Sequence, residues 1–250
     1  MGPRLRALLP LSALLLGWAS DGVPMPGGLD PHAIDEDCGA LVSERPPGAR
    51  ARPTGHALGS LDRATCERLL GEAAVPFVPA DGLAAAVEQP IRLAGPVGGV
   101  RIVPSGGEPD SIHSILDCRL ALALARWTPA LRARGVAGIE HVSMYRPNAR
   151  IRGTGRVSGH AHGLALDALA FVLDDGTRLP VLRAWLDRAA GADPCAEHQD
   201  DPGTARMRGA VCAAVEQDLF QVVLTPHHDA AHANHVHLEV RPHVGWSFVR

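Results

Sequence analysis

The stretch SGHAHGLALD, residues 158 to 167, places two histidines and a carboxylate in a run of small and apolar residues. Asp167 falls within a predicted strand over residues 163–176, between apolar neighbours, so we expect its carboxylate to be buried. A buried carboxylate needs an arginine, several hydrogen bonds or a metal ion as its partner. His160 precedes it by seven residues, across Gly163. That spacing lets a loop histidine fold back beside a strand aspartate.

A second group of histidines lies in HHDAAHANHVHLEV, residues 227 to 240, which holds five of the chain's 13 histidines. On a strand, alternate residues point to the same face, so His235 and His237 should project together. Two neutral imidazoles and one carboxylate form the open donor set with which catalytic zinc keeps a position for water. One histidine is then left to act as a neighbouring base. The alternative is that all these histidines are structural.

Composition limits the classes of partner and the compartment. With 250 residues, 46% of them hydrophobic, the chain is long enough for one main domain with a sizeable core. Because the net charge is −3 and the sequence has no basic cluster, we do not expect a nucleic-acid partner. Arg4 and Arg6 precede a short apolar run, and Ala19 ends a small-residue cleavage site. We therefore expect a signal peptide over 1–19 and an exported protein, periplasmic or secreted; a retained anchor is the alternative.

The five cysteines agree with export into an oxidising compartment. Local loop closure favours disulfides between Cys38 and Cys66 and between Cys195 and Cys212. Cys118 is then the odd cysteine. It lies in an apolar helical segment, which favours an inert buried thiol over a catalytic Cys/His pair.

Periodicity and breakers divide the rest of the chain. Residues 20–58 are rich in proline and glycine and should form a strap or linker, and one globular domain should follow over 59–250. We expect helices over 114–134, 179–190 and 204–218, and strands over 138–145, 163–176, 220–224 and 236–240. Helices and strands without regular βαβ alternation predict an α+β domain. Its small antiparallel sheet, packed with helices, would carry the metal site.

These motifs resemble those of known families. Ser158, His160, Gly163, Ala165 and Asp167 fill S-x-H-x-x-G-x-A-x-D, and H-x-H follows at His235 and His237. The pair of motifs resembles the lysostaphin, D-Ala-D-Ala carboxypeptidase and Hedgehog (LAS) group of zinc peptidases, including its carboxypeptidase (M15) type. More closely, the run from about Cys38 to Val240 resembles the bacterial extensin-like C-terminal domain family.

The resemblance implies a role for each of these residues. His160, Asp167 and His237 would bind one zinc ion per chain, with ligand atoms about 3 to 4 Å apart. His235 would be the base, and Arg146 would face the substrate carboxylate or the oxyanion. His232, three residues before His235, is a rival base.

The sequence also departs from the family pattern. The extensin-like pattern has Cys-Arg shortly after the tyrosine, where this chain has Arg146-Pro147-Asn148. A family disulfide is therefore expected to be missing, with Cys118 as its orphaned partner. Asn234 stands where an acid is common, which bears on proton transfer.

The resemblance implies a zinc peptidase, and for an exported protein the expected substrates are peptidoglycan peptides, whose amide bonds it would hydrolyse. We expect the protein to be a monomer. After signal cleavage, no integral membrane domain is expected. The competing hypothesis is a zinc-stabilised module that binds cell-wall peptide or a partner protein without cutting it.

Overall fold

Two β-sheets and several helices form the part of the chain that this computed structural model describes. The described residues are 45, 47–51, 56–106, 108, 110–151, 154–186, 188–196 and 198–250, and all belong to one unit, Ile34–Arg250. The expected signal peptide over 1–19 lies outside them, as does most of the expected strap over 20–58. Within the described ranges, no helix has the length and apolar content needed to cross a bilayer.

The elements follow one another in mixed order. They are β1 (Arg50–Ala51), α1 (His56–Gly59), α2 (Arg63–Glu72), β2 (Phe77–Pro79), β3 (Pro90–Leu93), β4 (Arg101–Pro104), the 3₁₀ helix η1 (Ile112–Ser114), β5 (Ile115–Asp117), α3 (Cys118–Arg132), β6 (Val136–His141), the 3₁₀ helix η2 (Gly159–His162), β7 (Ala165–Leu173), β8 (Arg178–Pro180), α4 (Val181–Ala184), α5 (Pro202–Glu216), β9 (Val222–Leu224), β10 (Val236–Glu239) and β11 (Trp246–Val249).

Eight strands form the larger sheet, in the order β1-β11-β9-β10-β7-β6-β4, with β8 also paired to β7. Most pairs are antiparallel, but β4 runs parallel to β6 and β11 runs parallel to β9. Strands β2, β3 and β5 form a separate sheet. The α+β class expected from the sequence is confirmed. The sheet is larger than expected and partly parallel, because β4 and β11, which were not anticipated, join it.

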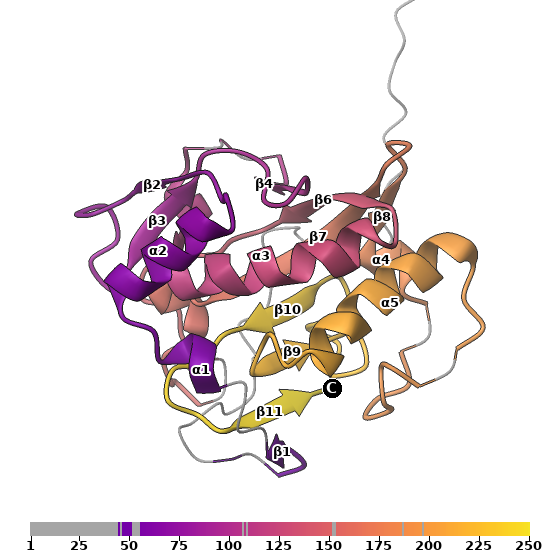
Figure 1. Ribbon diagram of the computed structural model, residues 1–250. Coiled ribbons are helices and arrows are strands. Elements are labelled where there is room, and N and C mark those ends of the chain that lie inside the picture. Colours follow the sequence, from indigo (N-terminus) through magenta and orange to yellow (C-terminus); the bar gives the residue numbers. More distant parts are fainter. Residues whose placement is uncertain are drawn as a thin grey trace, which may run out of the picture. The chain divides into compact units, whose positions relative to one another are not determined.

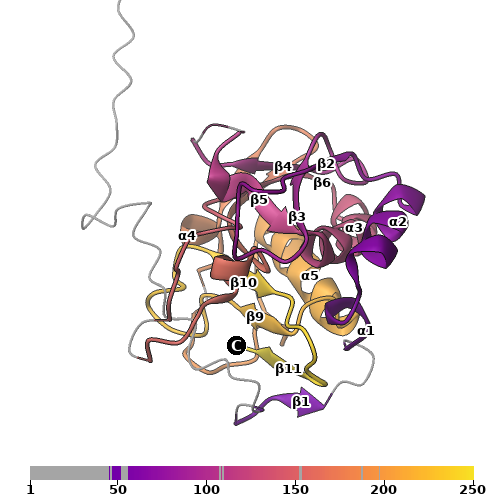
Figure 2. The same ribbon diagram turned by 90° about the vertical axis from the view of Figure 1, so that its left-hand side faces the viewer.

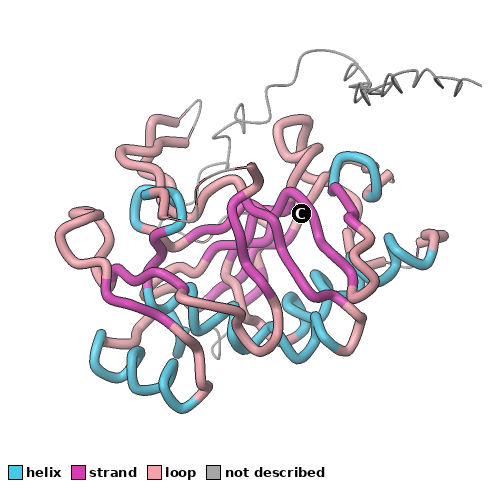
Figure 3. The backbone as a smooth tube through the Cα atoms, turned by 90° about the horizontal axis from the view of Figure 1, so that it is seen from above, coloured by secondary structure: helices cyan, strands magenta, loops and turns pink. Residues whose placement is uncertain are grey.

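The longer helices α2, α3 and α5 lie together on one side of the large sheet (Figures 1 and 2). Seen from above, most of the helical segments lie on one side of the strands (Figure 3). Trp127 of α3 connects these layers, since its ring meets Phe171 of β7 and Phe220 edge-on, with centroids 6.1 and 5.8 Å apart. Its indole N–H donates to the Ala210 carbonyl of α5 at 2.7 Å. The helices thus hold β7, the strand that carries Asp167, at the centre of the core.

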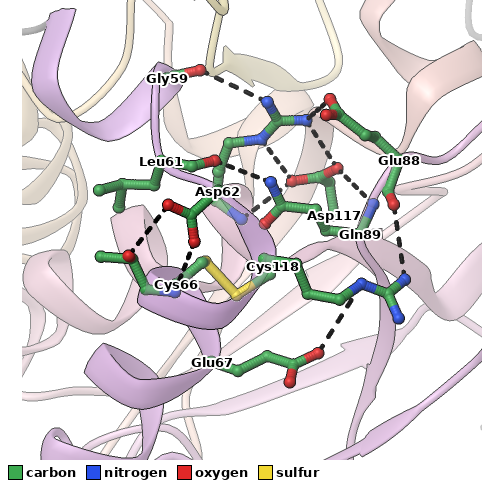
Figure 4. Close-up of a disulfide and its surroundings, with 12 residues drawn as sticks. Gly59, Leu61, Asp62, Cys66, Glu67, Glu88, Gln89, Asp117 and Cys118 are labelled. Carbon is green, nitrogen blue, oxygen red and sulfur yellow. Dashed lines mark hydrogen bonds and ion pairs between the residues drawn. A yellow bond between two sulfur atoms is a disulfide. The ribbon is translucent and has the colours of Figure 1, made fainter.

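Two disulfides fix the described fold, and one of them differs from the expectation. Cys195 and Cys212 are bonded, with their Cα atoms 5.6 Å apart, so this expected pair is confirmed. Cys66 is bonded to Cys118 and not to Cys38, so the other expected pair is wrong (Figure 4). Cys118 is therefore neither a free thiol nor an orphaned partner. The cause is tertiary: α2 packs against α3, which brings together two cysteines 52 residues apart. Cys38 lies outside the described residues.

Two expected helices begin or end elsewhere. The helix expected over 114–134 starts at Cys118, because Ile115–Asp117 pairs with β3 and the Asp117 carboxylate caps the helix through the backbone N–H of Arg119. The helix expected over 179–190 is reduced to α4, because Arg178–Pro180 pairs with β7 as a strand. The guanidinium of Arg188 then donates to the Leu182 and Trp185 carbonyls at the end of α4.

Candidate metal centre

Strands β7 and β10 are antiparallel neighbours and bring Asp167 directly opposite His237. Directly opposed residues share a face of the sheet, so both side chains point to the same side. That face is closed to solvent, since Asp167 is 1% and His237 0% exposed. The sequence expectation that Asp167 is buried is thus confirmed.

A tight turn brings His160 to the same place. The Ser158 hydroxyl accepts from the backbone N–H of His160 and begins η2, and Gly163 ends it with a φ of +63°. A side chain at Gly163 would be strained by that φ, and its Cβ would lie 3.0 Å from the backbone nitrogen of Asp117. The glycine therefore allows the chain to turn back, and Nε2 of His160 lies 3.0 Å from Oδ2 of Asp167.

The three side chains expected to bind zinc therefore converge, and we call His160, Asp167 and His237 the Asp167 site. One ligand-type atom from each lies within 4.8 Å of the others. Nδ1 of His237 lies 2.9 Å from Oδ1 of Asp167, which completes the set with His160 on the other carboxylate oxygen. This is the convergence that the motif spacing predicts.

The outer hydrogen bonds indicate which nitrogen of the His160 ring carries the proton. Nδ1 of His160 lies 3.3 Å from the carbonyl oxygen of Met144, which only accepts, so Nδ1–H donates there. His237 lies between two carboxylates, with Nε2 3.1 Å from Glu239 and Nδ1 2.9 Å from Asp167, and its N–H donates to one of them. For His160, the nitrogen that the neutral ring turns to Asp167 then carries the lone pair.

A contact between two acceptors results, at 3.0 Å between Nε2 of His160 and Oδ2 of Asp167. Nε2 of His160 and Oδ2 of Asp167 are buried, and neither has a hydrogen-bond partner of acceptable geometry among the described residues. Lone pairs at such distances repel each other unless a cation lies between them. The donor set, two imidazoles and a carboxylate, is one that zinc uses. The residues present therefore fit a bound metal ion.

The charges agree with this arrangement. Burial raises the pKa of the Asp167 carboxyl, but the influence of the surrounding His160, His235 and His237 outweighs it and holds the pKa well below the usual value. Burial lowers the pKa of His160, so its ring is neutral at neutral pH. A carboxylate with neutral imidazoles is the protonation state that a metal ion requires.

His235, the expected base, lies at the edge of this site. Its Nε2 is 3.7 Å from Oδ1 of Asp167, and its Nδ1 is 2.8 Å from Oδ1 of Asn234. Because Asn234 accepts from Nδ1–H in this orientation, Nε2 is left as the lone pair that faces the site. Burial is the main cause that lowers the pKa of His235 to about 3. His235 is therefore neutral at neutral pH, with the lone pair of Nε2 directed toward the site.

The two other expected catalytic residues occupy different positions. Arg146 lies beside the site, with Nη2 3.8 Å from Oδ2 of Asp167 and its side chain 16% exposed. His232, the rival base, is fully buried, and its ring centroid is 5.0 Å from that of His235. Nδ1 of His232 is 2.7 Å from Asp229. Among the contacts described, His235 approaches the Asp167 carboxylate and His232 does not.

Two residues of the site were missed by the sequence reasoning. Glu239 is buried and holds His237 through Oε2, and its Oε1 forms an ion pair with the guanidinium of Arg241, 2.8 Å from Nε. Alternation along the strand could have found it, since Glu239 follows His237 by two residues. His141, at the end of β6, is fully buried, and neither ring nitrogen has a hydrogen-bond partner within the described residues.

The fold and site define an α+β protein with a buried cluster of histidines around one aspartate. The family model described as "Extensin-like protein C-terminus" matches residues 81–250. The chain therefore belongs to the extensin-like family, as its motifs indicate. The match covers both motif stretches. It begins at residue 81, later than the resemblance seen in the sequence, which starts at about Cys38. No curated protein and no solved structure matches the chain.

Proposed function

We propose that the chain is an exported zinc-dependent peptidase that binds the metal at the Asp167 site and hydrolyses amide bonds in cell-wall peptides. The observation that carries the proposal is the convergence of His160, Asp167 and His237, with the unprotonated Nε2 of His160 3.0 Å from an Asp167 oxygen that has no hydrogen-bond donor among the described residues. A divalent cation removes the repulsion in this contact. Glu239 and the Met144 carbonyl act as the outer partners that orient ligating histidines.

The remaining residues suit amide hydrolysis. Zinc, when bound, supplies Lewis-acid chemistry that activates water and polarises an amide carbonyl. His235 takes a proton from the attacking water at Nε2, since Asn234 holds the other ring nitrogen. Arg146, partly exposed beside Asp167, stabilises negative charge on the carbonyl oxygen or anchors a substrate carboxylate.

Two features of the sequence support the substrate class. The S-x-H-x-x-G-x-A-x-D and H-x-H motifs resemble those of the LAS zinc peptidases, which act on cell-wall peptides. The arginine-led apolar segment at the N-terminus favours export to the compartment where such peptides lie.

Metal analysis of the purified chain, joined to a digest of whole peptidoglycan sacculi, tests the proposal. The parent should carry zinc and release peptide fragments. Asp167→Ala should lose that zinc and melt at a lower temperature, because metal binding is linked to folding. His235→Ala should keep the zinc and lose hydrolysis by about 10²- to 10⁴-fold. An Asp167→Ala variant with the same zinc content as the parent would refute the metal assignment.

Burial of the site favours a second candidate, a zinc-stabilised module that binds cell-wall peptide without cutting it. His160, Asp167, His235 and His237 are each at most 1% exposed, so a substrate has little access to them in this conformation. A parent that is loaded with zinc, binds sacculi in a sedimentation assay and releases no fragments from them would favour this module over the peptidase.

A further inference from the structure

A second group of ligand-type side chains lies in the loop between β9 and β10, and we call His228, Asp229 and His232 the loop cluster. One ligand-type atom from each lies within 4.8 Å of the others. Nδ1 of His232 lies 2.7 Å from Oδ1 of Asp229, and Nε2 of His228 lies 3.4 Å from Oδ2. Asp229 thus offers one oxygen to each histidine.

The local sequence H-D-x-x-H builds this cluster from one turn. Oδ1 of Asp229 also accepts from the backbone N–H of His232 at 3.0 Å, which closes the turn over residues 229–232. The backbone N–H of His228 donates to the Thr225 carbonyl at 2.8 Å. The rings of His228 and His232 then lie edge-on to each other, with centroids 5.0 Å apart. The turn is hydrogen-bonded at both ends and brings the three side chains together.

We propose that the loop cluster is a second metal site, which binds a divalent transition-metal cation such as Zn²⁺ or Co²⁺. A set of two imidazoles and one carboxylate suits such cations, whereas Ca²⁺ and Mg²⁺ favour oxygen ligands. Ligand atoms in a tetrahedral site with bonds of about 2.1 Å lie about 3.4 Å apart. The separation of 3.4 Å between His228 and Asp229 matches this value, and the 2.7 Å between His232 and Asp229 needs only a small opening.

Exposure leaves one side of this site open. The His232 side chain is fully buried, whereas those of His228 and Asp229 are 19% and 34% exposed. Protein side chains would thus bind the cation on its buried side, and solvent or a further ligand would complete the coordination on its exposed side. This differs from the Asp167 site, whose ligands are closed off.

The two sites lie close together but are distinct. The loop cluster and the Asp167 site share no residue among those described. Paired metal ions about 3.5 to 4 Å apart are typically held together within one site, whereas here each cation has its own carboxylate. The His232 ring is 5.0 Å from that of His235 and 6.4 Å from that of His237, measured between centroids. We therefore infer two neighbouring single-metal sites, and this inference does not depend on the proposed hydrolysis.

Metal titration of the untagged, metal-free full chain tests the second site. Zn²⁺ binding is counted by calorimetry, and Co²⁺ binding is followed by its visible absorption. The parent should bind two equivalents. His228→Ala should bind one equivalent. Its affinity for metal at the loop cluster should fall by more than about 10-fold, because loss of an outer partner alone can already cost about that much and His228 is a direct ligand. His243→Asn is the matched control, because His243 is exposed and should leave both equivalents in place.

The outcomes separate this inference from the proposed function. Asp167→Ala should also bind one equivalent, which it holds at the loop cluster. The variant that combines His228→Ala with Asp167→Ala should bind none. A parent with one equivalent that is lost in His228→Ala and kept in Asp167→Ala would support the loop cluster and remove the basis of the proposed peptidase. A His228→Ala variant that binds as many equivalents as the parent, with unchanged affinities, would overturn the second site.

Discussion

Replacement of His141 by leucine should remove a large part of the pH dependence of folding stability. Burial is the main cause that lowers the pKa of His141 to about 4, from 6.5, against the opposing influence of Asp167. The unfolded chain therefore binds more protons than the folded chain between these two pH values, and the free energy of unfolding falls as the pH falls through this window. The stability that His141 contributes is complete above about pH 6.5.

The two pKa values set the size of the effect. A group that changes from a pKa of about 6.5 unfolded to about 4 folded lowers the free energy of unfolding by about 2 kcal/mol between about pH 7.5 and about pH 5. His141→Leu should not show this loss. At neutral pH its stability should be close to that of the parent, since the change removes two buried nitrogens that have no described partner and keeps a similar volume.

The measurement is urea unfolding of the parent and the variant at both pH values, with a chelator present so that no metal binds. Comparison of the two proteins isolates His141 from the other buried histidines, which titrate in both. His243→Asn serves as a control, because the exposed His243 has a φ of 60° that asparagine tolerates. A stability difference between parent and His141→Leu that changes by less than about 0.5 kcal/mol between the two pH values would refute the lowered pKa.

Three further predictions concern the site and the fold. Glu239→Gln should weaken zinc binding by about 10- to 100-fold, measured by chelator competition, because it loses a charged outer partner. Replacing Cys66 and Cys118 together by serine should lower the free energy of unfolding by up to about 4 kcal/mol in denaturant titrations, since their separation of 52 residues closes a long loop. Asn234→Asp should raise the pKa of His235 above about 3, because an adjacent negative charge favours the protonated ring; NMR titration of the histidine ring shows this directly.

Part of the arrangement around Asp167 was predictable because it depends on short-range rules. Strand alternation places Asp167 among buried neighbours, and Gly163 marks the turn that returns His160 to it. His237 is 70 residues from Asp167, and only the resemblance to known families implied that the two side chains meet. That the three side chains bind zinc stays a prediction.

The disulfide between Cys66 and Cys118 was not predictable in the same way. Its two cysteines come together only because α2 packs against α3, a contact between segments 52 residues apart in the chain. Proximity in sequence favoured another pair for Cys66. Where local loop closure did apply, at Cys195 and Cys212, the expected bond is present.

His141 escaped notice for a related reason. The strand over 138–145 was expected, but its pairing with β7 is irregular, with a shift in register between Glu140 and His141. The side of the sheet on which a residue falls changes at such a shift. Alternation counted from the sequence therefore does not give the surroundings of His141.

A purely structural role for these histidines conflicts with the charges around Asp167. The carboxylate is ionised and 1% exposed, and the nearest guanidinium, that of Arg146, is still 3.8 Å away. A structural aspartate at such depth would normally be met by donors, because each buried polar atom without one costs about 1 to 3 kcal/mol. His160 offers a lone pair instead, since its N–H is directed to Met144. If the chain binds no divalent cation at this site, His160 must carry a proton on Nε2, either as a charged ring or as the neutral tautomer that donates to Asp167. A ¹⁵N NMR spectrum of the metal-free protein at neutral pH that shows a proton on Nε2 would therefore favour the structural role, and a neutral ring with its proton on Nδ1 would favour the metal.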